Sequence, residues 1–229
     1  ITLTYYEDKS IEVEDFGRGC PVDWNPIEKR YNWELVFCEL YAGGKYKNAD
    51  GGDYEYSLGL NGLGACATQY ASEYMDVTVW RDGNKYTLHF AKGKIKGKML
   101  VEPSDRKKTG TTTRWKPDIE VFTDINIPES YFLDILGRQA VVNAGVTFRF
   151  RAQHGAKFET TEFCYKNGIA DYVAELAGES PLTQPYYIET ERKGKDREDK
   201  PEYKVRMSAA FCFSNRTNAI EYYHNSSWL

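Results

Sequence analysis

The chain has 229 residues, of which 41% are hydrophobic and 15% aromatic, enough for one large packed domain or two smaller ones. Its net charge of −4 at pH 7 argues against a nucleic-acid clamp formed by this segment alone. No apolar run approaches the roughly 20 residues of a membrane span, and no signal peptide opens the chain, so we expect no membrane partner.

The five cysteines are widely spaced and form no Cys-x-x-Cys pair. Because they are odd in number, they favour reduced thiols in a cytoplasmic protein over a disulfide framework or a zinc site. The three histidines also lack the spacing of metal ligands, so no metal-binding residue is predicted.

The first predicted elements are a hairpin and a helix. Alternating apolar residues over 1–6 and 11–14 flank a turn at Asp8-Lys9 and predict two antiparallel strands. Apolar residues at helical spacing then predict a helix over 26–41, with Ile27 on its apolar face and Gly43-Gly44 as its C-cap.

A polar, glycine-rich segment over 45–56 follows, which is either a lid beside a ligand site or an ordinary surface loop. After a predicted helix over 64–72, strands over 75–81 and 85–90 flank a hairpin turn at Asp82-Gly83-Asn84. The lysine-rich stretch over 92–98 predicts a solvated strand edge.

The second half of the chain reads as strand, helix and strands, and then as a new domain. It predicts a strand over 109–115, a helix over 128–142, strands over 146–151 and 158–163, a helix over 169–176, and strands over 186–190 and 203–214. The pattern changes at Tyr165, which predicts a boundary between domains 1–164 and 165–229.

The glycine run Gly59-Leu60-Asn61-Gly62-Leu63-Gly64 leads directly into the predicted helix over 64–72. Three glycines leave backbone N–H groups uncovered where a helix begins, and the helix dipole favours an anion there, so the place suits a phosphate chain. The spacing is that of neither a dinucleotide-binding fold nor a P-loop. The alternative is a plain turn packed beneath a helix.

Asp15 ends the second predicted strand and is followed by Gly17 and Gly19. An aspartate there can accept a hydrogen bond from an exocyclic amine such as that of adenine, or it can be a turn aspartate that bonds its own backbone. Asp-Phe-Gly also matches the metal-binding triplet of kinases, but the other kinase motifs are missing and exclude that class.

In chain order, Asp15-x-Gly17-x-Gly19, Ala42-Gly43-Gly44-Lys45, Gly59 to Gly64 and Lys108-Thr109-Gly110-Thr111 resemble the GHKL ATPase superfamily. Its fold is the Bergerat α/β sandwich, of the α+β class. Tyr41 to Lys45, Lys108 to Thr111 and Phe148-Arg149-Phe150-Arg151 look like the B subunit of bacterial type IIA topoisomerases, DNA gyrase or topoisomerase IV. The resemblance covers essentially the whole chain.

The ending Phe213-Ser214-Asn215, followed by Tyr222-Tyr223-His224-Asn225, resembles the start of that family's transducer domain, which is ribosomal protein S5 domain 2-like. The resemblance therefore implies a GHKL ATPase domain in 1–164 and the first part of a transducer domain in 165–229.

The resemblance also implies residue roles. Asp15 would bond the adenine amino group, with Thr111 beside it sharing an ordered water. Around them, the pocket wall near the base, its mouth and its outer edge would be formed by Gly17, Arg18, Cys20, Pro21 and Arg81. The phosphates would be held by Gly43, Gly44, Lys45, Gly59, Leu60, Asn61, Gly62, Leu63 and Gly64.

The chain departs from the family at several places. Asn61 stands where gyrases commonly carry histidine, and Cys20 replaces an aliphatic residue. The family's water-activating glutamate and magnesium-binding asparagine are expected before Ile1, and its transducer lysine beyond Leu229. We therefore expect no catalytic residue here, and expect this segment alone to bind adenine nucleotide weakly, if at all, without hydrolysing it.

For the full-length protein, the resemblance implies an ATP-dependent topoisomerase that couples ATP and Mg²⁺ binding to DNA strand passage. Its partners would be DNA, the A subunit and a second copy joined by ATP-driven dimerisation. The alternative is another GHKL nucleotide-binding module, as in MutL proteins or chaperones. The continuation after residue 165 favours a topoisomerase or a MutL protein, and Ala42 to Lys45 then favours the topoisomerase. The sequence does not separate gyrase from topoisomerase IV.

Overall fold

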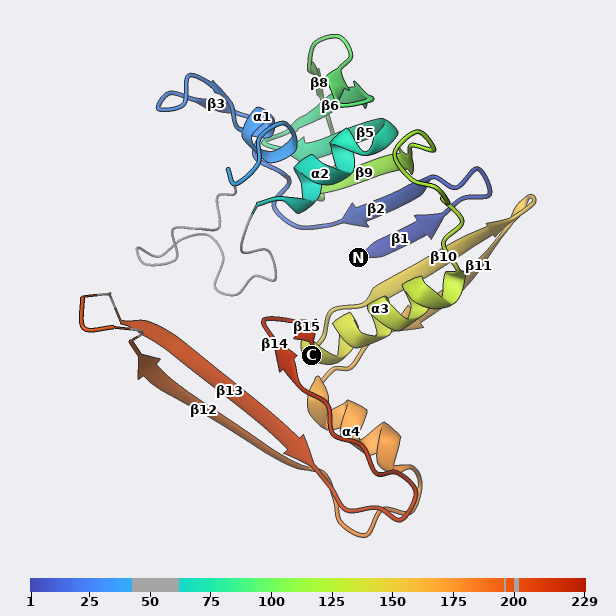
Figure 1. The fold of residues 1–229 in the computed structure, drawn as a ribbon, viewed down its shortest axis with the longest axis vertical. Coiled ribbons are helices and arrows are strands. Elements are labelled where there is room, and N and C mark those ends of the chain that lie inside the picture. Colours follow the sequence, from blue (N-terminus) through green and yellow to red (C-terminus); the bar gives the residue numbers. More distant parts are fainter. Residues whose placement is uncertain (43–61, 196, 200–201) are drawn as a thin grey trace. The chain divides into compact units, whose positions relative to one another are not determined.

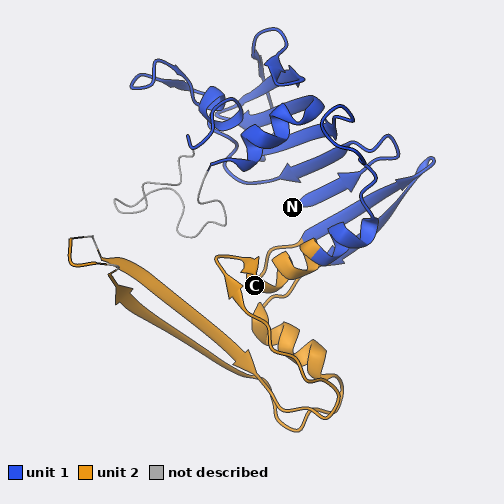
Figure 2. Cartoon of the chain, viewed as in Figure 1, with its two compact units in different colours: residues 1–46, 59–134, 148–162 blue, residues 47–58, 135–147, 163–229 orange. Residues whose placement is uncertain are grey.

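The computed structural model describes residues 1–42, 62–195, 197–199 and 202–229. This part of the chain divides into two compact units (Figure 2). The first holds residues 1–42, 62–134 and 148–162, and the second holds 135–147 and the described residues from 163 onward. The domain boundary near Tyr165 stays a prediction.

The first unit is built on a nine-stranded mixed sheet in the order β11-β10-β1-β2-β9-β5-β6-β7, with β8 also paired to β6. β1 pairs in parallel with β10 and antiparallel with β2. The sheet strands are β1 Thr2–Tyr5, β2 Ile11–Asp15, β5 Ser72–Arg81, β6 Asn84–Ala91, β7 Lys94–Ile95, β8 Leu100–Pro103, β9 Gly110–Pro117, β10 Phe148–His154 and β11 Lys157–Phe163.

Helices α1 (Asn32–Phe37) and α2 (Gly64–Tyr70) lie on the same face of this sheet (Figure 1). Alternation along β5 turns its apolar side chains toward the helices, because successive strand residues face opposite sides. We call the opposite side of β2, β5 and β9 the open face. The side chains of Asp76, Thr78 and Trp80 lie on the open face of β5. The buried core cluster consists of Val22, Trp33, Phe37, Met75, Val77, Val79, Leu88 and Phe90.

Most predicted elements of the first unit are confirmed. The hairpin β1–β2, helix α2, the hairpin β5–β6, β9, β10, β11 and the edge strand β7 all lie where the patterns place them. Helix α3 (Glu129–Val142), which begins in this unit and continues into residues of the second, follows Pro128 as predicted. Its Phe132 ring packs on Tyr5 and Phe150.

The helix predicted over 26–41 is wrong in its first half. Two short strands, β3 (Trp24–Asn25) and β4 (Arg30–Tyr31), occupy that region, and the helix is confined to Asn32–Phe37. The Asn25 side-chain oxygen accepts the N–H groups of Ile27 (3.0 Å) and Glu28 (3.1 Å), which stabilises a turn in competition with a helix. Glu34 then accepts the Tyr31 N–H and caps the helix start.

Ile27, predicted on the apolar helix face, is consequently 85% exposed. The helix ends at Phe37, and the N–H of its C-cap residue, Cys38, bonds the Glu34 carbonyl. The predicted C-cap at Gly43-Gly44 lies outside the described residues.

The second unit contains α4 (Ile169–Ala177), β12 (Tyr186–Gly194), β13 (Tyr203–Phe211), β14 (Tyr223–His224) and β15 (Ser227–Trp228). The predicted helix and long strands are confirmed, although β13 ends at Phe211 rather than at residue 214. Side-chain contacts with α3 and α4 fix the last residues of the chain within this unit. Tyr172 and Tyr223 both donate to the Glu221 carboxylate, and the Arg138 guanidinium lies 3.6 Å from the centre of the Trp228 ring.

Strands β12 and β13 form an antiparallel ribbon with two unlike faces. Register and alternation place the pairs Tyr186–Phe211, Ile188–Ala209 and Thr190–Met207 on one face. Glu189–Ser208, Glu191–Arg206 and Lys193–Lys204 lie on the other face, so that face carries most of the charged side chains of the ribbon. Among the described residues, no helix is long and apolar enough to cross a membrane.

Alanine at two glycines is expected to change stability in opposite directions. Gly83 has φ +73° in the β5–β6 turn, where an L side chain is strained, so Gly83→Ala should lower the free energy of unfolding by about 1 kcal/mol. At Gly137 in α3, a Cβ would meet Phe163 at an ordinary 3.6 Å, so Gly137→Ala should raise it by up to about 1 kcal/mol. Urea unfolding midpoints of the two variants test the opposite signs, and a fall for both would contradict the prediction.

Candidate functional site

Asp15, the last residue of β2, stands directly beside Thr111 of β9 in the sheet register. Its Oδ1 accepts the Gly17 N–H at 2.7 Å, as a turn aspartate does. Within the described part of the chain, no hydrogen bond to Oδ2 is formed. The two interpretations left open by the sequence are therefore compatible, since one oxygen holds the turn and the other can serve a ligand.

The start of β9 is fastened to the loop that follows Asp15. Thr111 Oγ1 accepts the Cys20 N–H at 2.9 Å, and the Thr109 hydroxyl donates to the Gly17 carbonyl at 2.6 Å. A Cβ on Gly110 would lie 2.1 Å from the Asp15 carbonyl oxygen, so only glycine permits this approach. The predicted Asp15, Gly17, Cys20 and Thr111 are thus brought together.

Arg81, at the end of β5, lies against the same loop. Its Nη1 is 3.5 Å from the Gly19 carbonyl oxygen and 3.4 Å from that of Cys20, while its Nε donates to Asp82 at 2.9 Å. The predicted Arg18 and Pro21 are exposed on this loop. Arg81 therefore connects the end of β5 to the loop that follows Asp15.

The Cys20 thiol is the titratable group most perturbed at this site. Burial raises the pKa of the Cys20 thiol to about 12, and the Asp15 carboxylate adds to the rise, while the Arg81 guanidinium opposes it. The thiol is consequently protonated at neutral pH.

Alkylation should distinguish Cys20 from the exposed Cys164. Because the thiolate is the nucleophile, iodoacetamide at pH 8 should modify Cys164 at least about tenfold faster than Cys20. Peptide mass mapping over time gives both alkylation rates, and equal rates would contradict the prediction.

The raised pKa of Cys20 also makes the stability of the fold depend on pH. Between about pH 9 and 12 the unfolded state releases the Cys20 proton and the folded state retains it, so the contribution of Cys20 to stability declines as the pH rises.

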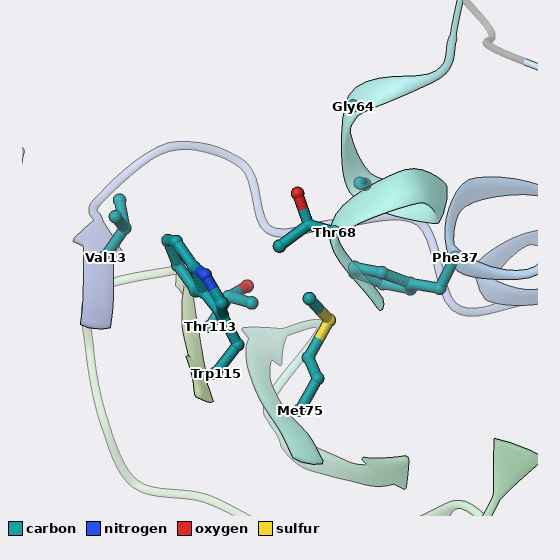
Figure 3. Close-up of a pocket in the computed structure, with 8 residues that line it drawn as sticks. Val13, Phe37, Gly64, Thr68, Met75, Thr113 and Trp115 are labelled. Carbon is teal, nitrogen blue, oxygen red and sulfur yellow. The ribbon is translucent and has the colours of Figure 1, made fainter. Parts of the chain in front are cut away.

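An apolar cavity of about 210 Å³ lies between the helices and the sheet (Figure 3). The Val13–Thr113 pair on its floor lies two residues from the Asp15–Thr111 pair along each of the same two strands, so both pairs face the same side of the sheet. Asp15 and Thr111 thus stand at one end of the cavity floor. The cavity is lined by Val13, Phe37, Gly64, Ala65, Thr68, Met75, Thr113 and Trp115.

Of these lining residues, only Gly64 was predicted as a site residue. The period-two alternation of strands around Asp15 and Thr111 could have pointed to Val13 and Thr113. Phe37 and Met75 could not be found in this way, because no local sequence pattern predicts how their elements, α1 and β5, pack together.

The start of α2 is the described part of the predicted phosphate loop. Gly62 has φ +59°, Leu63 is the N-cap without a side-chain cap, and a Cβ on Gly64 would meet open space. The other predicted phosphate-site residues lie outside the described residues, as does the possible lid over 45–56; they are Gly43, Gly44, Lys45, Gly59, Leu60 and Asn61. Among the described residues, no group of three His, Cys, Asp or Glu side chains could hold a metal ion.

A mixed sheet with helices on one face and an aspartate at a strand end beside Thr-Gly-Thr is consistent with the α+β fold of GHKL ATPase domains. No family model matches the chain. It is 33% identical over 182 residues to the topoisomerase IV B subunit of Salmonella typhimurium, covering 79% of this chain and 28% of that protein. It is 31% identical over 224 residues to the gyrase B subunit of Thermotoga maritima, covering 97% and 34%.

Solved structures agree with these relatives. The 43K ATPase domain of Thermus thermophilus gyrase B, in complex with an aminocoumarin, matches with a TM-score of 0.67 and 30% identity over 86% of this chain and 48% of that one. The topoisomerase IV ATP-binding domain of Francisella tularensis matches with a TM-score of 0.63 and 26% identity over 85% and 53%. The chain is thus homologous to B subunits of bacterial type IIA topoisomerases, and it spans about a third of the length of these curated relatives.

Proposed function

We propose that this chain is the nucleotide-binding region of a type IIA topoisomerase B subunit, and that the whole protein uses ATP to pass one DNA segment through another. The observation that carries the proposal is the Asp15–Thr111 pair at the end of an apolar cavity. A flat base fits between apolar walls, and a few polar groups at one end give it orientation.

Adenine would lie on the cavity floor with its amino group toward Asp15 Oδ2. Thr111 Oγ1 accepts from Cys20, so its own hydrogen remains to donate to a ring nitrogen or to a water shared with Asp15. Gly17, Cys20 and Pro21 would border the base, and Arg18 and Arg81 would lie at the rim. These roles rest on the family resemblance together with the placement of the loop.

The phosphates would extend toward the start of α2. There, the backbone of residues 59–64 would donate to the phosphate oxygens, and Gly43, Gly44 and Lys45 would close over them. The second possibility for the glycine run, a plain turn, predicts no phosphate contact at all.

In hydrolysis, the residues of this chain bind and orient the nucleotide, and the water-activating glutamate is expected elsewhere in the whole protein. Mg²⁺, when bound, neutralises phosphate charge. The described residues contain no group of three or more His, Cys, Asp or Glu side chains that could hold this ion.

The proposed partners are DNA, an A subunit and a second B subunit that associates when ATP binds, in the cytoplasm. A net charge of −4 gives this region little general attraction for DNA, so DNA contact is assigned to other parts of the whole protein.

The test uses the complete B subunit that contains this chain, reconstituted with an A subunit on plasmid DNA. Linking number is measured by gel electrophoresis with ATP, with a non-hydrolysable ATP analogue and without nucleotide. Multiple turnovers with ATP, and fewer with the analogue, support the proposal. Adenine-nucleotide binding without any change in linking number would instead support a GHKL module of another kind, and no nucleotide binding would contradict both.

A further inference from the structure

A cluster of aromatic and charged side chains lies next to Asp15 in the sequence and in the sheet, but on the open face, opposite to the cavity. Its centre is Arg106, in the connection between β8 and β9, and we call it the Arg106 cluster: Glu14, Phe16, Trp80, Arg106 and Lys108. Glu14 and Trp80 follow Val13 and Val79, which face the cavity side, so their own side chains face away from it.

Arg106 makes three contacts in this cluster. Its guanidinium lies 3.9 Å from the centre of the Trp80 ring and 5.5 Å from that of Phe16. Its Nη2 is 3.1 Å from a carboxylate oxygen of Glu14, and both side chains are partly buried. A planar guanidinium held by an ion pair over an aromatic ring is a favourable arrangement that a flexible ammonium reproduces only in part.

Phe16 connects this cluster to Asp15. Phe16 is 51% exposed, and cations approach its ring from Arg106 and from Lys108, whose Nζ lies 5.4 Å from the ring centre. Phe16 is also the middle residue of the turn in which Asp15 Oδ1 accepts the Gly17 N–H. Restraining the Phe16 ring therefore restrains the backbone that orients the Asp15 carboxylate.

We propose that Arg106 is a positioning residue which, through Phe16, holds the Asp15 carboxylate in the orientation that selects adenine over guanine. This inference rests on the proposed function. Adenine presents an amino donor at the atom where guanine presents a carbonyl acceptor, so a carboxylate fixed at that point favours adenine and repels guanine. A carboxylate free to turn loses this discrimination.

Arg106→Leu removes the cation and the ion pair from the open face, without touching the cavity. Because a partly exposed cation–π contact contributes only modestly, ADP affinity should fall about fivefold while GDP affinity stays the same. Arg106→Lys keeps a charge beside Glu14 and should recover part of the loss. Lys107→Leu removes an exposed charge from the same connection and is the matched control, with no expected change.

Two measurements test the inference. Calorimetry of the complete protein with ADP and with GDP gives the selectivity of each variant. Hydrogen exchange of the Gly17 amide, followed by NMR in the nucleotide-free chain, reports the Asp15–Gly17 bond directly. Arg106→Leu should speed this exchange about fivefold, and Lys107→Leu should leave it unchanged.

The outcomes separate the inference from the proposed function. Equal weakening of ADP and GDP in Arg106→Leu, or unchanged Gly17 exchange, overturns the positioning role although the wild type binds ADP. A wild type that binds neither nucleotide contradicts the proposed function. In that case faster Gly17 exchange would still show that Arg106 holds the turn, but its role in adenine selection would be overturned.

Discussion

Replacing Asp15 with asparagine is expected to lower adenine-nucleotide affinity about a hundredfold. The site needs two acceptor atoms at this side chain, one for the Gly17 N–H and one for the adenine amine. A carboxylate supplies both, whereas an amide has one acceptor oxygen and one donor NH₂ group. Either orientation of the asparagine side chain would set its NH₂ against another donor. An unpaired donor and a lost charged hydrogen bond together cost about 3 kcal/mol, which is about a hundredfold in affinity.

Calorimetric titration of the complete protein with ADP measures this effect. Asp76→Asn is the matched control, because Asp76 is paired with His89 across β5 and β6 on the open face. That variant should bind ADP like the wild type. If Asp15→Asn also binds normally, Asp15 is a turn residue only and the adenine site lies elsewhere.

Phe90→Ala is expected to be the most destabilising of these substitutions, lowering the free energy of unfolding by about 3–5 kcal/mol. Phe90 is 2% exposed, and its ring centre lies 6.1 Å from that of Trp33 and 5.8 Å from that of Phe37. Its removal opens a cavity where α1 packs on β6. Two aromatic contacts are lost together with the buried surface.

Ile27→Ala gives the contrast for this prediction. A helix over 26–41 with Ile27 on its buried face would make this substitution costly, whereas the observed turn leaves Ile27 85% exposed. We expect a change within about 0.5 kcal/mol. Urea unfolding of both variants, followed by tryptophan fluorescence and circular dichroism, is the measurement. A large loss for Ile27→Ala would contradict the fold around β3 and β4.

The strands and long helices were predictable because their signals are local. Alternation specifies β1, β2 and β10, and Asp82-Gly83 supplies the two positive φ values of its hairpin turn. The helix over 26–41 failed for an equally local reason. The apolar spacing was helical, but the Asn25 side chain competes for the backbone N–H groups of the first turn, and spacing alone does not weigh that competition.

The residues of the candidate site that belong to short sequence motifs were predictable, whereas those brought together by packing between elements were not. Asp15 and Thr111 could be named from motifs, although only the β2–β9 register places them side by side. The cavity wall needs Phe37, Met75 and Trp115 to converge from separate elements. Arg106 showed no signal, since its importance comes from contacts with Trp80 and Phe16 across the sheet.

The place of β1 in the sheet has a consequence for biosynthesis. β1 lies between β2 and β10, and its parallel register joins Thr2 to Arg149. β2 can pair as soon as it leaves the ribosome, but the other edge of β1 must wait for Arg149, which is made 147 residues after Thr2. During that interval the unpaired edge is open to wrong partners, and closing so long a loop slows folding. Slower translation upstream of residue 148 should therefore lengthen the period in which the nascent chain depends on chaperones.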